Sequence, residues 1–358
     1  MSGTSTEILP EGNGTPAKRR HILRNILLSV GAVLLIGSLS AGAFAFGLAH
    51  AFDSKVAKIA SPFPADALRP KPVAPAASAP PSASAAATTA MNILVIGSDS
   101  RDTSQSAAEQ KAAGNQRSDT LMWVNIPADR KSINVMSIMR DNWTTIPGFG
   151  EAKINAAYAF GGVPLVVQTV EGLFGVRIDH VAVMDFEGFK SLTTALGGVP
   201  VDVPLSFTSK NMAGYTYTAG PMTLQGDQAL AFVRERYSFP DSDYQRVKDQ
   251  QAFVKGLLSK LSSGGTLTDP AKLLATIDSL KGYLSVDDGL DSAAVAALAV
   301  QLKDVKRSDI HTFTLPTKGT GTSSDGQSIV IMDMGAVYGI GKAMAADSLG
   351  QYLVANGL

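Results

Sequence analysis

Three short segments place charged side chains directly beside apolar runs of the chain. They are residues 97–101, 117–120 and 234–250. The first follows a predicted strand at 92–96, and the second precedes a predicted strand at 120–126. Ligands of α/β proteins bind where strands end, so these segments are candidates for one shared site.

Asp99 and Asp119 are the acidic candidates, because each stands at the end of a predicted strand. If the two strands are neighbours, both carboxylates could hold one hard cation, since Mg²⁺ prefers one or two carboxylates with water and phosphate oxygens. Two loop aspartates that cap turns or helices explain the same spacing. The spacing alone leaves both interpretations open.

Arginine is the stronger signal for an anion. Arg234 and Arg236 share one face if the chain is extended there, and Arg246 and Gln250 share one helix face because they are four positions apart. Guanidinium groups match phosphate oxygens in pairs. Further arginines near the first strands are Arg101, Arg117 and Arg140.

The same arginines also have a simpler interpretation. Each can pair with a nearby acid, such as Glu235, Asp141 or Asp129. The fold would have to bring all six together for a phosphate site to form. On the helix predicted at 244–261, an apolar stripe would bury one side and leave Arg246 and Gln250 at a cleft edge; it consists of Val247, Val254, Leu258 and Leu261.

Composition excludes several classes of function. The chain has 358 residues, of which 31 are Lys or Arg and 31 are Asp or Glu, so a general nucleic-acid binder is not expected. It contains no cysteine, which excludes disulfides, cysteine nucleophiles and cysteine-bound zinc. The four histidines lack metal-ligand spacing, and there is neither a phosphate-loop motif nor a Gly-x-Ser-x-Gly elbow.

The N-terminal region predicts a membrane anchor. Residues 1–24 form a polar tail that ends in basic residues, and no side chain from 25 to 52 carries a fixed charge. Roughly 20 apolar residues span a bilayer, and positive charge stays inside. We therefore expect a cytoplasmic tail and an extracytoplasmic remainder. A cleaved signal peptide is the alternative, because Ala43-Phe44-Ala45 resembles a cleavage site.

Residues 53–90 are predicted to be a spacer before a globular domain at 91–350. Seven prolines stand among alanine and serine in 61–90, a composition that favours extended polyproline II with a reach of about 90 Å. Within the domain, the patterns predict strands and helices that alternate, and hence an α/β or α+β sheet covered by helices. The strands are expected at 92–96, 120–126, 132–139, 180–184, 199–203, 311–315 and 328–332, and the helices at 162–174, 185–196, 225–232 and 244–261.

In this order, the segments resemble the LytR-CpsA-Psr family of cell-wall ligases. The resemblance covers about 91–261, with a weaker continuation to roughly 349, and no single motif carries it. The matching segments are 96–101, 117–120, 137–141, 146–148, 153–158, 197–199, 229–237 and 246–251. The resemblance implies an α/β/α sandwich with a central mixed sheet and a long apolar pocket for a polyprenyl chain.

The resemblance also implies a chemistry. A glycosyl-1-phosphate unit would pass from a polyprenyl-pyrophosphate carrier to peptidoglycan, typically to the muramic acid 6-hydroxyl. Asp99 and Asp119 would bind Mg²⁺ or Mn²⁺. The pyrophosphate would be held by Arg101, Arg117, Arg140, Arg234, Arg236 and Arg246, with Gln250 close by. Arg236, Arg234 and Asp99 would act most directly in catalysis, with Asp99 favoured over Asp243 as the base.

Two positions depart from the family pattern. Met139 stands where proline usually precedes the Arg-Asp pair, and Asp249 stands where arginine often precedes Gln-Gln. The first departure could relax the loop that carries Arg140, and the second removes a positive charge from the helix. Neither removes a residue assigned to the phosphate site.

Three other functions compete with the transferase. A polyprenyl-pyrophosphate hydrolase would use the same residues with water as the acceptor. A non-enzymatic envelope protein would bind wall polymer, or regulate the envelope, without turnover. An intracellular regulator on a membrane anchor is opposed by the predicted topology.

Overall fold

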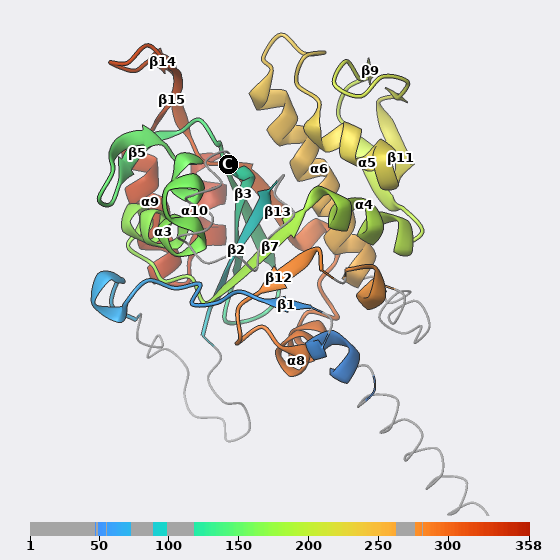
Figure 1. Cartoon of the computed structure of the whole chain (residues 1–358), viewed down its shortest axis with the longest axis horizontal. Helices are drawn as coiled ribbons and strands as arrows, with labels where there is room; N and C mark the ends of the chain where they lie inside the picture. Colours follow the sequence, from blue (N-terminus) through green and yellow to red (C-terminus); the bar gives the residue numbers. More distant parts are fainter. Residues whose placement is uncertain are drawn as a thin grey trace, which may run out of the picture. The chain divides into compact units, whose positions relative to one another are not determined.

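The computed structural model describes residues 47, 49–54, 56–72, 89–98, 118–262, 276–280 and 282–358. The chain divides into two compact units, Met1–His50 and Ala51–Leu358. The second unit carries the fold (Figure 1). The predicted cytoplasmic tail, most of the predicted membrane segment and the charged stretch 99–117 lie outside the described residues.

A seven-stranded sheet forms the centre of the second unit. In spatial order its strands are β1 (Ala57–Lys58), β12 (Leu284–Val286), β7 (His180–Asp185), β2 (Met91–Ser98), β3 (Ser118–Ile126), β4 (Ile133–Ile138) and β13 (Ile310–Thr314). Three neighbouring pairs are parallel, namely β1 with β12, β7 with β2, and β4 with β13, and the other pairs are antiparallel. The predicted α/β architecture with a central mixed sheet is confirmed.

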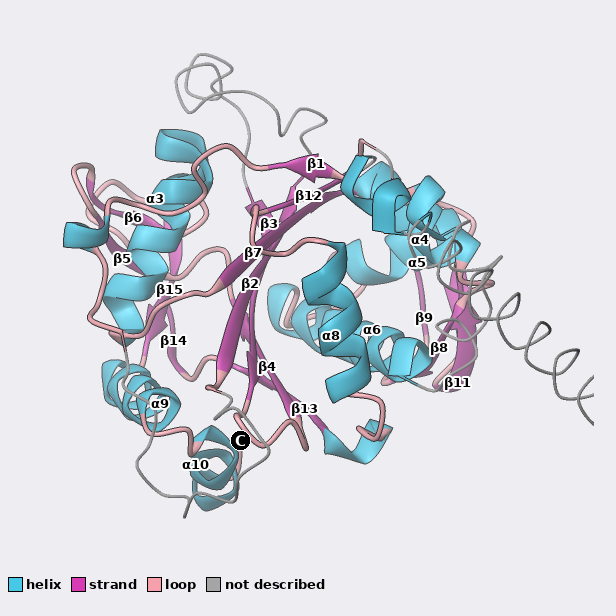
Figure 2. Ribbon diagram, turned by 90° about the horizontal axis from the view of Figure 1, so that it is seen from below, coloured by secondary structure: helices cyan, strands magenta, loops and turns pink. Residues whose placement is uncertain are grey.

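Helices cover both faces of this sheet (Figure 2). One face carries α3 (Ala156–Phe174), α9 (Met334–Ala345) and α10 (Leu349–Asn356), and the other carries α4 (Phe186–Ala195), α5 (Gly226–Arg234), α6 (Asp243–Ser262) and α8 (Ser292–Gln301). The period of two in a strand divides the side chains between the faces. In β2, Leu94 and Ile96 enter the core beneath α3, whereas Val95 faces α6.

Helix α3 is the apolar core helix of the first face. Gly161 and Gly162 interrupt its helical geometry, and Pro164 follows them, so the continuous part begins near the predicted start at 162. Among the described residues, α3 is the one helix long and apolar enough to cross a bilayer, and 61% of its most apolar 18-residue window is buried in the unit. That burial is typical of a core helix.

Short hairpins and turns lie outside the central sheet. The hairpins are β5 (Trp143–Ile146) with β6 (Gly150–Lys153), β8 (Val199–Val203) with β11 (Gly220–Leu224), β9 (Phe207–Thr208) with β10 (Thr216–Tyr217), and β14 (Thr317–Thr322) with β15 (Ser328–Met332). The 3-10 turns are η1 (Asp66–Leu68) and η2 (Arg307–Asp309). Helix α6 approaches β8 so closely that a side chain at Gly256 would collide with the Pro200 carbonyl, and this contact fixes the helix against the β8–β11 hairpin.

Part of the predicted spacer belongs to the folded unit. Residues Ala57 and Lys58 form β1 at the edge of the sheet, paired with β12. Further along, Arg69 Nη2 lies 2.6 Å from Glu171 Oε1 and donates to the Ile178 carbonyl at 2.6 Å. The Glu171 side chain is only 1% exposed, so this ion pair anchors the segment to α3. The described residues 56–72 therefore differ from the extended spacer expected from residue 53.

Candidate active site

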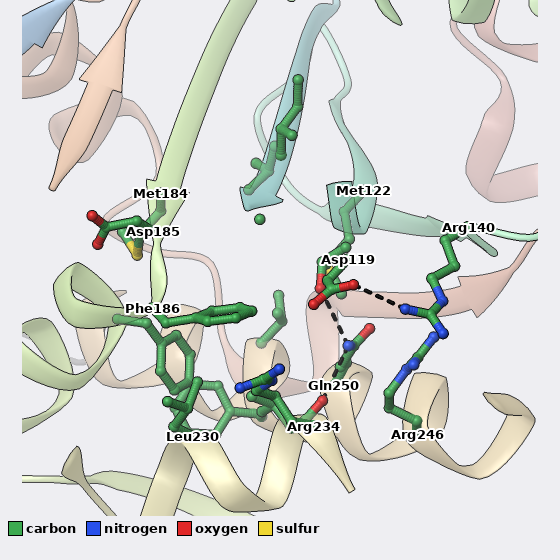
Figure 3. Close-up of a pocket in the computed structure, with 18 of the residues that line it drawn as sticks. Asp119, Met122, Arg140, Met184, Asp185, Phe186, Leu230, Arg234, Arg246 and Gln250 are labelled. Carbon is green, nitrogen blue, oxygen red and sulfur yellow. Dashed lines mark hydrogen bonds and ion pairs between the residues drawn. The ribbon is translucent and has the colours of Figure 1, made fainter. Parts of the chain in front are cut away.

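A pocket of about 420 Å³ opens between the sheet and helices α4, α5 and α6. Figure 3 shows its lining. Most of the wall is apolar and is supplied by β2, β3, β7 and β12 on one side and by the three helices on the other; it includes Val95, Met122, Ala182, Met184, Phe186, Phe189, Leu230, Phe253, Val254, Leu257 and Leu284. The space suits a long apolar chain.

One part of the same pocket is polar. It is lined by Asp119, Arg140, Arg234, Arg236, Arg246 and Gln250. These six residues come from β3, α5, α6 and the two connections that follow β4 and α5. All six are residues that the sequence analysis assigned to a phosphate or metal site, so the fold brings this part of the predicted site together.

Asp119 and Arg140 meet because of strand register. Strands β3 and β4 are antiparallel with Leu121 opposite Ile138, so two positions further along Asp119 stands opposite Arg140. Arg140 Nη1 donates to Asp119 Oδ1 at 2.9 Å. Burial alone would lower the pKa of Arg140, but the charges of Asp243, Asp141 and Asp119 raise it. The guanidinium is therefore a permanent cation at the pocket.

Helix α6 contributes Arg246 and Gln250 from one face, as predicted. Arg246 is buried, with Nη1 3.1 Å from Asp243 Oδ1, and its burial lowers its pKa. Gln250 Nε2 donates to Thr120 Oγ1 at 3.2 Å and to the Val233 carbonyl at 3.1 Å. The amide of Gln250 therefore connects β3, α5 and α6 at the floor of the pocket.

Arg234 and Arg236 stand on either side of the end of α5. The guanidinium of Arg234 lies over the Phe186 ring, 4.2 Å from the centroid, and it has no carboxylate partner among the residues the structure describes. Arg236 Nη1 is 3.8 Å from Asp243 Oδ1, and its Nη2 donates to the Tyr237 hydroxyl at 2.9 Å. Asp243 thus lies between Arg236 and Arg246, where helix α6 begins.

The acids near these arginines only partly match the simpler interpretation. Asp141 pairs with Arg140 at 3.6 Å and with Lys153 at 3.0 Å, as that interpretation expects for Arg140. Glu235 makes no ion pair within the described part of the chain; it accepts backbone N–H groups instead. Carboxylates therefore neutralise only part of the arginine charge, and the arginines still line one pocket.

The remaining predicted site residues cannot be placed in this way. Asp99, Arg101 and Arg117 lie outside the described residues. The two departures from the family pattern leave the described site intact. Met139 is buried and Arg140 still reaches Asp119, while Asp249 is buried at 0% exposure and does not line the pocket.

Asp119 is the described residue that fits a divalent cation. Its side chain is 26% exposed at the pocket, and within the described residues only Oδ1 accepts a hydrogen bond, from Arg140. No cluster of three His, Cys, Asp or Glu side chains occurs among the described residues. One or two carboxylates completed by phosphate oxygens suffice for Mg²⁺. Asp119 is therefore suited to be one of the two predicted metal ligands.

The resemblance implies an apolar pocket, but no pattern in the sequence indicated which residues form its wall. Phe186, Leu230 and Phe253 read as ordinary core residues, because their helical spacing is the same whether they face a core or a cavity. In the structure they line the pocket beside the arginines. The arrangement suits an amphiphile with an anionic head and an apolar tail.

Comparison with known proteins gives a consistent result. The family model described as the LytR_cpsA_psr family matches residues 56–345. Cell wall biosynthesis protein LcpA of Corynebacterium glutamicum is 30% identical over 289 residues, which are 71% of this chain and 55% of that protein. The polyisoprenyl-teichoic acid–peptidoglycan teichoic acid transferase TagU of Bacillus licheniformis is 30% identical over 277 residues, which cover 77% and 83% of the two chains.

Coverage differs among these relatives. TagU of Bacillus cereus is 38% identical over 203 residues, 56% of this chain and 63% of that protein. The chain thus spans roughly half to two-thirds of the length of LcpA and of this TagU. Among solved structures, Bacillus subtilis TagV has a TM-score of 0.61 at 24% identity, covering 73% of this chain and 98% of TagV. That likeness concerns the fold.

Proposed function

We propose, because this chain belongs to the LytR-CpsA-Psr family, that it transfers a glycosyl-1-phosphate unit from a polyprenyl-pyrophosphate carrier to a hydroxyl group of peptidoglycan. One observation carries the proposal. Four arginines and Gln250 gather at one part of a pocket whose wall is otherwise mostly apolar. A polyprenyl pyrophosphate has the matching shape, with an anionic head and a long apolar tail.

The arginines would bind the pyrophosphate and neutralise charge during transfer. Arg140 and Arg246 line the pocket beside Asp119, and Arg234 and Arg236 line it from the end of α5. Phosphoryl transfer depends mostly on positioning and on stabilising charge at the phosphate oxygens. Guanidinium groups held by Asp119, Asp243 and the Phe186 ring are already oriented for that task.

The transfer step balances without a covalent enzyme intermediate. The acceptor hydroxyl oxygen bonds to the phosphorus that carries the glycosyl group, and the bond from that phosphorus to the bridging oxygen breaks. Polyprenyl phosphate leaves with the bridging oxygen and its negative charge. The hydroxyl proton would pass to a carboxylate, for which Asp99 and Asp243 are the candidates.

We also propose that Asp119 and Asp99 hold Mg²⁺ or Mn²⁺. The proposal is supported by the exposure of the Asp119 carboxylate at the pocket and by its single hydrogen bond among the described residues. When bound, the cation would neutralise charge on the pyrophosphate. Arg140 would then orient the Asp119 carboxylate through Nη1.

We infer that the unit works outside the cytoplasmic membrane, tethered by residues 25–52. The folded unit reaches back to the predicted end of the membrane segment, because it begins at Ala51 and Asp53 accepts two hydrogen bonds from Ser292. The unit would therefore stay near the bilayer that holds the polyprenyl tail.

A transfer assay tests the proposal. The ectodomain, residues 51–358, is incubated with Mg²⁺, a short-chain polyprenyl-pyrophosphate glycan and a peptidoglycan fragment, and mass spectrometry detects the phosphodiester-linked product. The proposal predicts a product that disappears with EDTA or Arg236→Ala and persists in Arg177→Ala, an arginine that pairs with Asp66 away from the pocket. Released polyprenyl phosphate without linked product would identify a hydrolase, and no turnover would favour a binding protein.

A further inference from the structure

Glu235 is a buried carboxylate between two arginines of the pocket. It is 0% exposed, and it follows Arg234 where α5 ends. Six hydrogen bonds converge on it, three on each oxygen. A buried charge normally needs an ion partner, yet within the described chain these six donors are all neutral backbone or hydroxyl groups.

One oxygen holds the turn that carries Arg236. Glu235 Oε1 accepts the backbone N–H of Arg236 at 2.9 Å, of Tyr237 at 2.7 Å and of Ser238 at 3.1 Å. Three successive N–H groups pointing at one oxygen leave this turn little freedom. Arg236 and Tyr237 both line the pocket, so the orientation of their backbone sets where the guanidinium and the phenol can reach.

The other oxygen holds a different segment of the chain. Glu235 Oε2 accepts from Ser209 Oγ at 2.6 Å, from Lys210 N at 2.7 Å and from Asn211 N at 3.0 Å. Asn211 lines the pocket, and its Nδ2 lies 3.4 Å from the Arg234 carbonyl. A single carboxylate therefore joins two pocket-lining segments that are more than twenty positions apart.

We propose that Glu235 is a positioning residue for the pyrophosphate site. Its carboxylate holds the Arg236 turn and the Ser209–Asn211 loop together, so that the two segments form one rigid rim of the pocket. The inference rests on the proposed function, because it takes pyrophosphate as the ligand of that rim. Glu235 itself is buried behind the rim and does not line the pocket. It acts through Arg236 and Asn211.

The chemistry of the side chain explains why a carboxylate is needed. Six donors require two acceptor oxygens, and glutamine offers one oxygen and one NH₂ group. In Glu235→Gln, whichever way the amide is turned, three donors would face NH₂. Burial alone would raise the pKa of Glu235, but hydrogen bonds from Asn211, Ser209, Lys210 and Ser238 lower it to about 2. The carboxylate thus stays ionised throughout the neutral range.

Loss of stability alone has to be separated from loss of positioning. Glu171 provides the matched control, since it is also a buried glutamate, 1% exposed, and accepts from Arg69 and from the Ile178 N–H. It belongs to α3 on the opposite face of the sheet and does not line the pocket. Glu171→Gln should destabilise the fold without changing the phosphate site.

The experiment compares the ectodomain variants in two ways. Titration calorimetry with farnesyl pyrophosphate and Mg²⁺ measures the Kd, and the transfer assay measures kcat/KM. We expect Glu235→Gln to raise the Kd and to lower kcat/KM by about tenfold or more, with amide hydrogen exchange accelerated in 209–212 and 236–239. Glu171→Gln should leave the Kd and kcat/KM within twofold of the parent protein.

Several outcomes would overturn the inference. One is a Glu235→Gln protein with parental Kd and kcat/KM; another is an equal loss in Glu171→Gln. If Glu235→Gln does not fold, Ser209→Ala removes one donor of the six, and an unchanged Kd in that variant contradicts the inference. If the parent protein binds farnesyl pyrophosphate but transfers nothing, the proposed transfer is wrong, while the comparison of Kd values still tests Glu235.

Discussion

Arg140 and Asp119 face each other at the ends of two antiparallel strands, with Nη1 2.9 Å from Oδ1. The register of β3 and β4 places them opposite. Under the proposed function, the pair would join the phosphate-binding and metal-binding halves of the candidate site. Because Arg140 holds the Asp119 carboxylate and faces the same pocket, it would couple the position of the proposed cation to that of the phosphate.

Asp119→Asn tests the proposed metal role of this carboxylate. Asparagine keeps an oxygen that can accept from Arg140 but removes the negative charge, so we expect the concentration of Mg²⁺ at half-maximal activity to rise and kcat to fall by about 100-fold. Activity measured against Mg²⁺ concentration provides the readout. Asp347→Asn, remote from the pocket at the Ala128 N–H, is the control. An unchanged Mg²⁺ requirement in Asp119→Asn would remove Asp119 from the metal site.

Ala182→Phe tests whether the apolar wall receives the polyprenyl chain. Ala182 lies on β7 and lines the pocket, so a phenyl ring there would occupy space needed by the tail. We expect KM for a long-chain donor to increase at least tenfold. Binding of inorganic pyrophosphate, measured by calorimetry, should not change. An equal loss for inorganic pyrophosphate would mean that the fold, and not the tail site, was damaged.

Asp249→Asn should change how stability depends on pH. Burial raises the pKa of Asp249 to about 7, and its Oδ2 is buried without a hydrogen bond within the described residues. The folded state therefore binds a proton that the unfolded state releases near pH 4. Below pH 4 Asp249 is neutral in both the folded and the unfolded state, so no buried charge destabilises the fold. As the pH rises from about 4 to about 7, the unfolded state loses its proton first and the free energy of unfolding decreases.

Asparagine is neutral at every pH, so it avoids that loss. We expect Asp249→Asn to be more stable than the parent protein at pH 8, by on the order of 2 to 4 kcal/mol. The difference should shrink steadily toward pH 4. Urea unfolding at pH 4.5, 6 and 8 measures it. A stability difference independent of pH would show that the pKa of Asp249 is the same in the folded and the unfolded protein.

Arg69→Ala tests whether residues 56–72 are part of the fold. Removing one partner of a buried ion pair leaves the other charge buried, which costs about 3–5 kcal/mol. Because Glu171 is 1% exposed, we expect a loss of that size in urea unfolding of the ectodomain. Arg177→Ala, whose partner Asp66 is 84% exposed, should cost about 1 kcal/mol. Equal small losses would mean that the segment is only loosely attached.

Much of the fold follows from sequence patterns. The predicted strands at 92–96, 120–126 and 132–139 correspond to β2, β3 and β4, and the helix predicted at 185–196 corresponds to α4. These elements were predictable because apolar runs and helical periods are local signals. Strand β1 was not, because it has two residues and exists only through pairing with β12, as Ala57 with Ser285 shows.

The candidate site, like the fold, could be predicted from the sequence only in part. The types of residue that line the pocket could be predicted from three short segments, but their convergence depends on tertiary packing. Glu235 illustrates the limit. In sequence it stands between two arginines and suggests an ion pair, whereas in the structure it accepts N–H groups of its own turn and of the Ser209–Asn211 loop. No local pattern indicates a hydrogen bond across that separation.

Phosphorus chemistry gives the most direct test of the transferase account. The ectodomain is incubated in H₂¹⁸O with Mg²⁺, the short-chain polyprenyl-pyrophosphate glycan and the peptidoglycan fragment. Mass spectrometry then measures the ¹⁸O content of each product. Transfer uses the oxygen of the acceptor hydroxyl, so we predict a linked phosphodiester and a polyprenyl phosphate that both lack ¹⁸O. A glycosyl phosphate carrying one ¹⁸O, with no linked product, would mean that water is the acceptor and would contradict the account.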